Sequence, residues 1–289
     1  MNLIIDYINK KLSAHRNQLE LEPFPHIVID DFLPKEVFEQ ISYTILNNEK
    51  NFKDVQSIYN TPLEFGKKTY NDTNLNRILK IPIEIMGGDI FKIIIKSFFG
   101  KANIISLTDI ENYGGYSPFH VMHNKGFLGS HIDHSRSIHG DFHVANSIFY
   151  ASPKWSINDG GETILFNHNG LVIKKLILPK PNRLIIFLHT AETFHGVNTI
   201  SDSSKNKRYT YYMDYYIKKE DLRCNKLNFN INKYNPKYCD HDTTFIPFFP
   251  IGLKSFRLKS ILNLRLVFQY IYAYFKYLFN KSFKKVNFN

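Results

Sequence analysis

The sequence contains only two cysteines, Cys224 and Cys239, among its 289 residues. Two cysteines do not make the disulfide framework of a small secreted domain, so we expect the protein in a reducing cytosol. His241 follows closely, but no fourth ligand stands at a spacing typical of zinc sites, which argues against zinc. The first residues also lack a basic leader followed by a long apolar core, so we expect no secretory signal.

Acidic residues are absent from Thr243 to Asn289, whereas eight lysines and arginines stand in this tail. The whole chain has a net charge of +11, so most of its positive excess lies there. Because this charge is concentrated in an apolar segment, we do not expect a nucleic-acid partner. No repeat of solenoid length is present either, which excludes that class of fold.

The front of the chain carries apolar residues at helical spacing. Pro82 and the pair Gly87-Gly88 should break the last of these helical stretches into pieces. Residues 47–76 are polar and mixed, and the pattern assigns no element to them. The expected elements are a helix within 2–20, a strand at 26–32, a helix that begins near Pro34 and helical residues at 74–99.

From Asn103 onward the pattern changes toward short strands, separated by clusters of Gly, Pro, Asn and Ser. Aromatic residues make up 15% of the chain, which favours β-rich packing over a helical bundle. A helical front section followed by nine strands predicts a mainly β fold, a double-sheet jelly roll or sandwich with helices on an outer face. The candidate strands are 103–112, 117–123, 127–134, 143–151, 162–166, 171–178, 183–189, 194–200 and 208–217.

Residues 129–135 read Gly-Ser-His-Ile-Asp-His-Ser and contain the most informative pair of side chains. On a strand, His131 and Asp133 project from the same face because they are two residues apart. His195 stands in another β-prone run. Two histidines and one carboxylate leave coordination positions open on a non-haem Fe(II), as in an oxygenase. The alternative is that all three are ordinary polar residues at strand ends.

Chance arrangements of such residues do occur in a chain with 12 histidines, and His139 with Asp141 is one. Glu192 and His195 also spell the Glu-x-x-His of di-iron bundles. That motif needs a helix and a second copy, and neither is present.

The order His-x-Asp, then His195, then Arg208 resembles the Fe(II)/2-oxoglutarate-dependent dioxygenase superfamily, and within it the prolyl-4-hydroxylase-like members. The Pro-Phe-Pro-His sequence that leads into residues 27–33 is similar to the opening strand of the family. Gly160-Gly161-Glu162-Thr163 resembles the turn between its two ligating strands. The resemblance covers residues 23–218, and it implies a double-stranded β-helix (jelly roll) core.

The resemblance implies a catalytic centre in which His131, Asp133 and His195 bind Fe(II). Fe(II), 2-oxoglutarate as cosubstrate and O2 are then required, and 2-oxoglutarate is decarboxylated as a C–H bond of the acceptor is hydroxylated. Arg208 stands where the family clamps the cosubstrate carboxylate, and an Arg fork suits that bidentate pairing. Thr210 adds a hydroxyl on the same face, where the family often has Ser.

Three further residues are weaker candidates for the cosubstrate site. Asn146 and Tyr150 follow the metal pair on the next strand, although alternating core packing explains Tyr150 equally well. Arg183 is a rival to Arg208 as the clamp, but it follows a turn and we expect it to be exposed. Residues that could line the substrate mouth, or be rim residues without a role, are Tyr113, Tyr116, His123, Arg136 and Trp155.

The tail from Ser260 to Lys285 has the spacing of a long helix with a wide apolar face. Arg265 and Lys276 interrupt it, so we do not expect it to span a membrane. Flanking lysines and many aromatic residues suit a helix lying in a membrane interface. A helix docked on the domain or on a second copy remains an alternative, because periodicity does not distinguish protein from lipid.

We therefore expect an Fe(II)- and 2-oxoglutarate-dependent hydroxylase in the cytoplasm, peripheral on the inner face of the membrane if the tail binds lipid. Its acceptor would be a membrane-associated glycan or lipid-linked precursor, or a prolyl peptide, since the fold does not fix a substrate. The alternative is a non-catalytic jelly-roll binding module that retains the pocket. The expected parts are a helical support region at 1–100, the core at 101–218, an irregular connection at 219–250 and a basic amphipathic helix at 251–289.

Overall fold

Most of the described helices lie in the first hundred residues, ahead of most of the strands, as the sequence predicts. The computed structural model describes residues 2–15, 18–48, 63–70, 76–99, 103–115, 117–218, 220–221, 237–247 and 264–284. The described helices are α1 (Asn2–His15), α2 (Lys35–Asn48), α3 (Arg77–Gly87), α4 (Asp89–Phe99) and α6 (Leu264–Phe283), with strand β1 (His26–Ile29) between α1 and α2.

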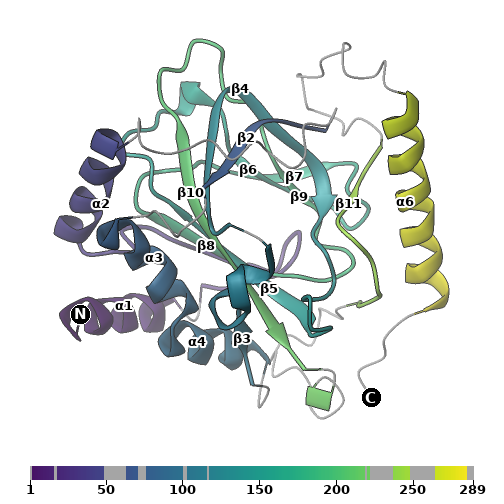
Figure 1. Cartoon of the computed structure of the whole chain (residues 1–289), viewed down its shortest axis with the longest axis horizontal. Helices are drawn as coiled ribbons and strands as arrows, with labels where there is room; N and C mark the ends of the chain where they lie inside the picture. Colours follow the sequence, from purple (N-terminus) through teal and green to yellow (C-terminus); the bar gives the residue numbers. More distant parts are fainter. Residues whose placement is uncertain are drawn as a thin grey trace.

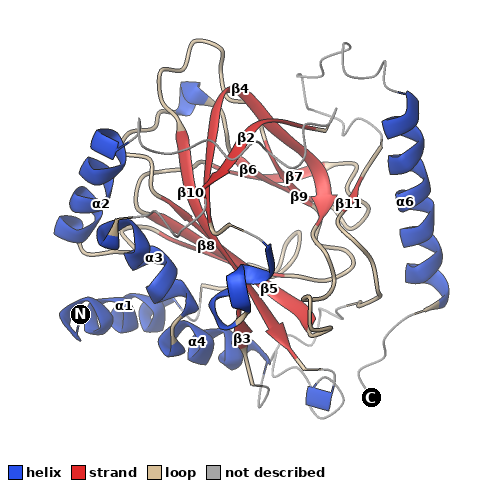
Figure 2. Ribbon diagram, in the orientation of Figure 1, coloured by secondary structure: helices blue, strands red, loops and turns tan. Residues whose placement is uncertain are grey.

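The strands form one curled antiparallel sheet (Figures 1 and 2). The remaining strands are β2 (Glu64–Tyr70), β3 (Ile105–Ser106), β4 (Phe119–Ile132), β5 (Phe142–Tyr150), β6 (Thr163–Phe166), β7 (Ile173–Ile177), β8 (Arg183–Leu188), β9 (His195–Val197), β10 (Arg208–Ile217) and β11 (Thr244–Phe245). Their order is β1-β8-β5-β10-β4-β9-β6-β7, with β2 and β11 on β4 and β3 on β10. The predicted mainly β jelly-roll class is confirmed.

Helices α1 to α4 lie together on one side of the sheet, and α6 lies on the other side beside β11 (Figure 1). The largest apolar core fills the space between α1 to α4 and the sheet. Its aromatic residues include Phe91 of α4, which stacks on Tyr215 of β10 at a ring distance of 6.4 Å. Burial of this apolar surface holds the helices against β10 and β5 and leaves the opposite face of those strands for the site.

The helical region at 74–99 does break at the glycine pair, but the expected break at Pro82 was wrong. Pro82 is buried inside α3. A proline within a helix removes one backbone hydrogen bond, and the packing of the apolar face of α3 outweighs that loss. The helix ends at Gly88, which adopts an extended conformation and donates its N–H to Ile85 O.

Two strand predictions were also wrong. Within 103–112 only Ile105–Ser106 is a strand, because the carboxylate of Asp109 accepts the N–H of Ser106 at 2.8 Å and stabilises a turn. The two expected strands at 117–123 and 127–134 are one continuous strand, β4, which runs from Phe119 to Ile132, since the positive φ of Lys125 (63°) distorts it without ending it. In the described residues, the 3-10 turns are Leu107–Asp109, Glu111–Gly115 and Ile157–Asp159.

Two strands lie in segments where the pattern predicted none. β2 lies in the unassigned polar region, and β11 lies in the expected irregular connection. Both pair with β4, so their strand conformation depends on a partner distant in the sequence. Most of the expected connection, and residues 260–263 of the expected tail helix, lie outside the described residues.

Candidate metal centre and cosubstrate pocket

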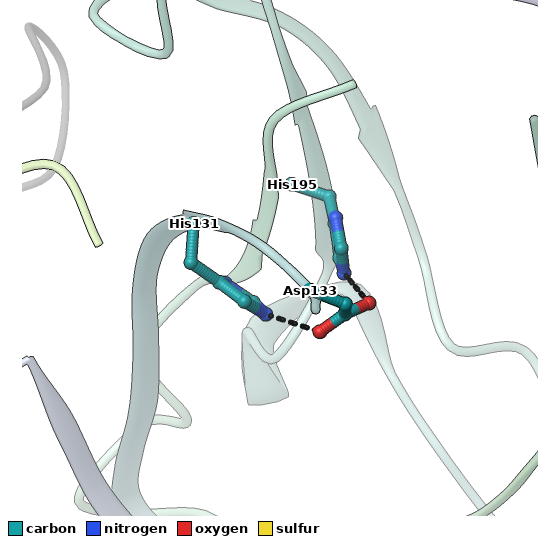
Figure 3. Close-up of side chains that lie close together, drawn as sticks. All are labelled: His131, Asp133 and His195. Atoms are coloured by element: carbon teal, nitrogen blue, oxygen red, sulfur yellow. Dashed lines mark ion pairs between the residues drawn. The ribbon is translucent and has the colours of Figure 1, made fainter. Parts of the chain in front are cut away.

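Two paired strands bring the predicted metal ligands together. His131 at the end of β4 is directly opposite His195 of β9, and their ring centroids are 4.3 Å apart. Asp133 follows β4 and turns its carboxylate between the two rings (Figure 3). One ligand atom from each of the three residues lies within 4.8 Å of the others.

Hydrogen bonds fix which nitrogen of each imidazole faces the carboxylate. His131 Nδ1 lies 2.9 Å from Gly129 O, and His195 Nδ1 lies 3.2 Å from Thr193 O. A carbonyl accepts but does not donate, so each Nδ1 carries a proton and each ring turns its Nε2, the nitrogen left for a metal, toward Asp133. The distances are 3.4 Å to Oδ1 and 3.3 Å to Oδ2. Two imidazole nitrogens and a carboxylate oxygen brought this close together form a donor set that fits Fe(II).

The electrostatics of the cluster agree with this description. Burial, followed by the interaction with the neighbouring His195 ring, lowers the pKa of His131 below its usual value, which favours a neutral ring that can bind a metal. Burial alone would raise the pKa of the Asp133 carboxyl, but the two imidazoles hold it well below its usual range. The carboxylate is therefore ionised and can act as a metal ligand.

Arg208, the first residue of β10, is buried in the same cavity. Its Nε donates to Gly161 O and its Nη2 donates to Thr163 Oγ1, each at 3.0 Å. Among the described residues no carboxylate lies within ion-pair distance of this guanidinium, and burial lowers its pKa. A buried cation without an anionic partner carries a large desolvation cost, which a bound carboxylate would offset.

The turn at Gly160-Gly161 sets the position of the guanidinium. Both glycines have a positive φ, +71° and +69°, which side chains other than glycine rarely adopt. A Cβ at Gly161 would lie only 2.9 Å from the ring of Trp155 and 3.4 Å from Cδ of Arg208. The backbone therefore approaches Arg208 closely enough for Gly161 O to accept its hydrogen bond.

Alternation along β10 determines which of its residues reach the cavity. Arg208, Thr210, Tyr212 and Asp214 all line it, whereas the residues between them pack into the helix-covered core. The predicted common face of Arg208 and Thr210 is therefore present. The cavity has a volume of about 870 Å³ and also contains the three candidate ligands. A pocket of roughly 300–1,000 Å³ takes a drug-sized ligand, so this one has room for an acceptor besides 2-oxoglutarate.

Asn146 contacts one of the three candidate metal ligands, Asp133, in a way that the sequence did not indicate. Its Nδ2 donates to Asp133 Oδ2 at 3.1 Å and to Asp214 Oδ1 at 3.0 Å. Its Oδ1 is buried and has no hydrogen-bond partner. Burial and the charge of Asp133 raise the pKa of the Asp214 carboxyl well above its usual value. The amide therefore links two carboxyl groups and fixes the orientation of Asp133.

Asp214 is the residue that sequence reasoning missed. Its even spacing from Arg208 along β10 is the signal that could have found it. It belongs to a second group of possible metal ligands with His134 and His143. Tyr216 Oη lies 2.9 Å from His134 Nε2 and donates to Asp214 Oδ2 at 3.3 Å. That hydroxyl already provides the partner that a metal would otherwise supply, so the group is explained by hydrogen bonding.

Tyr150 lies outside the lining of the cavity. Its hydroxyl oxygen is 2.5 Å from Thr163 Oγ1, and its ring lies 5.1 Å from the Arg208 guanidinium. Burial raises the pKa of the phenol, so it stays neutral and does not supply the missing anion. The tyrosine ring thus packs against the Arg208 guanidinium from outside the cavity lining.

The remaining candidates from the sequence differ in whether they reach the cavity. Arg183 is mostly buried and pairs with Asp30 at 2.6 Å, so the expected exposure was wrong, and this arginine already has its anion. Tyr113 lines the cavity, whereas His123, Arg136 and Trp155 do not. Tyr116 lies outside the described residues.

Comparisons with known proteins agree with the site. Residues 117–214, which span β4 to most of β10, match the family model of the 2OG-Fe(II) oxygenase superfamily. This core is therefore that of a 2OG-Fe(II) oxygenase. No curated protein matches the chain.

Among solved structures, the chain is similar to prolyl hydroxylases and to the protein HygX. A prolyl hydroxylase from Trichoplax adhaerens, solved with a hypoxia inducible factor peptide fragment, has a TM-score of 0.54 and 16% identity over 75% of this chain and 94% of its own. A prolyl-4-hydroxylase from Pseudomonas putida has a TM-score of 0.49 and 14% identity over 73% of this chain and 97% of its own. HygX from Streptomyces hygroscopicus, solved with nickel, 2-oxoglutarate and hygromycin B, has a TM-score of 0.46 and 11% identity over 72% and 86%.

The predicted family resemblance and enzyme class are thus confirmed. Residues 117–214 thus match the 2OG-Fe(II) oxygenase superfamily, whose cofactors are Fe(II), 2-oxoglutarate and O2, and the fold of the chain is similar to that of a prolyl hydroxylase.

Proposed function

We propose that this oxygenase holds Fe(II) with His131, Asp133 and His195 and hydroxylates a C–H bond of a polar, saccharide-containing acceptor. One observation carries the metal assignment. Two imidazoles, each protonated on Nδ1 by its hydrogen bond to a carbonyl, turn their Nε2 atoms toward the two oxygens of one carboxylate. A divalent cation at this point can bind both Nε2 atoms and the carboxylate together.

We assign the distal carboxylate of 2-oxoglutarate to Arg208 and Thr210. The guanidinium is buried without a described carboxylate partner, and the hydroxyl of Thr210 comes from the same face of β10. When bound, Fe(II) and 2-oxoglutarate together activate O2, and the cosubstrate is converted to succinate and CO2. The protein binds both groups, orients the acceptor C–H bond and keeps bulk water out of the cavity.

The lining of the outer cavity supports a polar acceptor. Carboxylates, an ammonium group, an amide and tyrosine rings contribute to it together, and such groups recognise a hydroxyl-rich molecule better than an aliphatic one. The residues concerned are Glu64, Lys67, Asp109, Glu111, Asn112, Tyr113 and Tyr212. Among the acceptors expected from the sequence, this lining favours a glycan or lipid-linked saccharide over a prolyl peptide.

Anaerobic titration tests the metal and cosubstrate assignments. Adding Fe(II) and 2-oxoglutarate to the full chain should produce a metal-to-ligand charge-transfer band, and air should then release succinate slowly without an acceptor. His131→Ala should remove the band and the succinate. His139→Ala is the matched control, because His139 is exposed and belongs to the chance pair with Asp141. A band that survives His131→Ala would refute the metal assignment.

Acceptor identity needs a separate measurement. Lipid-linked saccharides and prolyl peptides are supplied in parallel to the wild-type enzyme, and succinate release is compared with the gain of one oxygen atom in each candidate. We expect faster succinate release and oxygen gain with a saccharide. Oxygen gain in the peptide alone would overturn the saccharide assignment and leave the metal assignment intact.

A further inference from the structure

The outer face of α6 carries a continuous row of exposed aromatic side chains. Successive members are separated by three or four residues, so the row follows one side of the helix for about four turns. Each side chain in the row is 55–75% exposed, which is unusual for phenylalanine. The row consists of Phe268, Tyr272, Phe275, Phe279 and Phe283.

The inner face of α6 is already bound to the sheet side of the domain. Tyr277 is buried, and its hydroxyl donates to Ala191 O at 2.5 Å. Asn280 Nδ2 donates to Asp240 O at 2.8 Å. The domain therefore holds the helix with one face and leaves the aromatic row exposed. The helix itself lies on the side of the molecule away from α1 to α4 (Figure 1).

The charge of this part of the chain complements an anionic surface. The segment from Thr243 to Asn289 contains eight lysines and arginines and no acidic residue, although the whole chain has a net charge of only +11. Lys276 and Lys284 belong to the described part of α6 or follow it directly. Each basic residue near an anionic bilayer adds to the attraction.

We infer that α6 is an in-plane membrane helix whose aromatic row enters the interface of an anionic bilayer. No helix in the part of the chain that the structure describes has the length and hydropathy to cross a membrane. A helix with an apolar aromatic face, basic flanks and an opposite face bound to protein lies instead at the boundary of headgroups and acyl chains. Phenylalanine and tyrosine suit that depth, because their rings are apolar and the tyrosine hydroxyl stays in the wet layer.

Aromatic packing connects this helix to the metal centre. Tyr270 of α6 packs edge-on against Phe245 of β11 at a ring distance of 5.7 Å. Phe245 lines the cavity and stacks on His131 at 5.0 Å. The bilayer would thus lie on the side of the molecule where β11 borders the cavity. Delivery of a lipid-linked acceptor from the membrane follows only if the proposed function is correct, whereas the membrane inference does not depend on it.

Vesicle sedimentation of the full chain tests the inference. We expect the protein to pellet with phosphatidylcholine vesicles that contain phosphatidylglycerol and to pellet much less with phosphatidylcholine alone. High salt should weaken binding, because exposed charges are screened. The variant F268Q/F275Q/F279Q should bind roughly tenfold more weakly for each phenylalanine removed, since each loses apolar burial in the interface. Lys276→Glu should weaken binding about fivefold or more.

The matched control is the double variant Y43Q/I93Q, which replaces exposed apolar residues of α2 and α4. It should pellet like wild type. Unchanged circular dichroism and unchanged uncoupled succinate release would show that the triple variant is folded. Light scattering on the same samples covers self-association. The inference would be overturned if wild type did not pellet with the anionic vesicles, or if the triple variant pelleted equally well. It would also be overturned if wild type formed a dimer that the triple substitution dissociates and bound no vesicles.

Discussion

Replacing Arg208 by glutamine should separate cosubstrate binding from stability. The glutamine amide can still donate to Gly161 O or Thr163 Oγ1, but it carries no charge. Loss of one partner from a buried, hydrogen-bonded ion pair costs about 3–5 kcal/mol. Since about 1.4 kcal/mol corresponds to a factor of ten, we expect the affinity for 2-oxoglutarate to fall roughly 10²- to 10³-fold.

The stability of the cosubstrate-free protein should move in the opposite direction. In wild type the guanidinium is buried and has no described carboxylate to offset its desolvation, so the neutral variant should be at least as stable as wild type. Saturating 2-oxoglutarate stabilises a protein that binds it only in the folded state. Wild type should therefore gain melting temperature on addition of 2-oxoglutarate with Mn(II), and Arg208→Gln should gain almost none.

Calorimetric titration with 2-oxoglutarate and thermal melting provide the two measurements. Arg183→Gln is the matched control, because Arg183 pairs with Asp30 and lies outside the cavity lining. It should lose stability and keep its affinity for 2-oxoglutarate. Unchanged 2-oxoglutarate affinity in Arg208→Gln, or a cosubstrate-free variant several kcal/mol less stable than wild type, would refute the reasoning.

Three further predictions concern the metal centre and the first strand. Removal of metal with a chelator should abolish uncoupled succinate release, and Fe(II) should restore it in wild type but not in His131→Ala; release by the chelated protein would contradict the assignment. Asn146→Leu removes the hydrogen bonds to Asp133 and Asp214, so Mn(II) affinity measured by electron paramagnetic resonance should fall about 10- to 100-fold; unchanged affinity would show that the amide does not orient the carboxylate. The hydrogen bond from Arg183 lowers the pKa of Asp30 from 3.8 to about 2, although burial opposes this shift. The ionised Asp30 therefore stabilises the fold at pH values above its unfolded pKa, and this stabilisation is lost as the pH falls toward 2. Urea denaturation of Asp30→Asn should therefore show a deficit at pH 6 that shrinks at pH 3, and a constant deficit would count against the pair.

The residues of the candidate site could be named from the sequence because their order resembles that of a known family and because their spacing fits the geometry of strands. His131 and Asp133 are two residues apart, and Arg208 and Thr210 are as well, so each pair shares a face on any strand. The apolar and aromatic residues of β5, β8 and β10 likewise defined those strands closely, because nearly every residue of these strands is buried.

Elements that depend on a distant partner were not predictable in this way. β2 is polar and becomes a strand only by pairing with β4, and Pro82 remains in α3 because of packing that its neighbours in sequence do not reveal. The expected exposure of Arg183 was wrong for the same reason, since its partner Asp30 is 153 residues away in the sequence.

The sequence by itself determined the donor types, their order and the strands that carry them, because residue chemistry and the two-residue period of a strand are local properties. Only the tertiary structure decided that two Nε2 atoms face one carboxylate, that Asn146 joins Asp133 to Asp214, and that the aromatic row of α6 points outward. Those facts depend on strand register and on which surfaces pack together, and both are set by contacts between residues far apart in the chain.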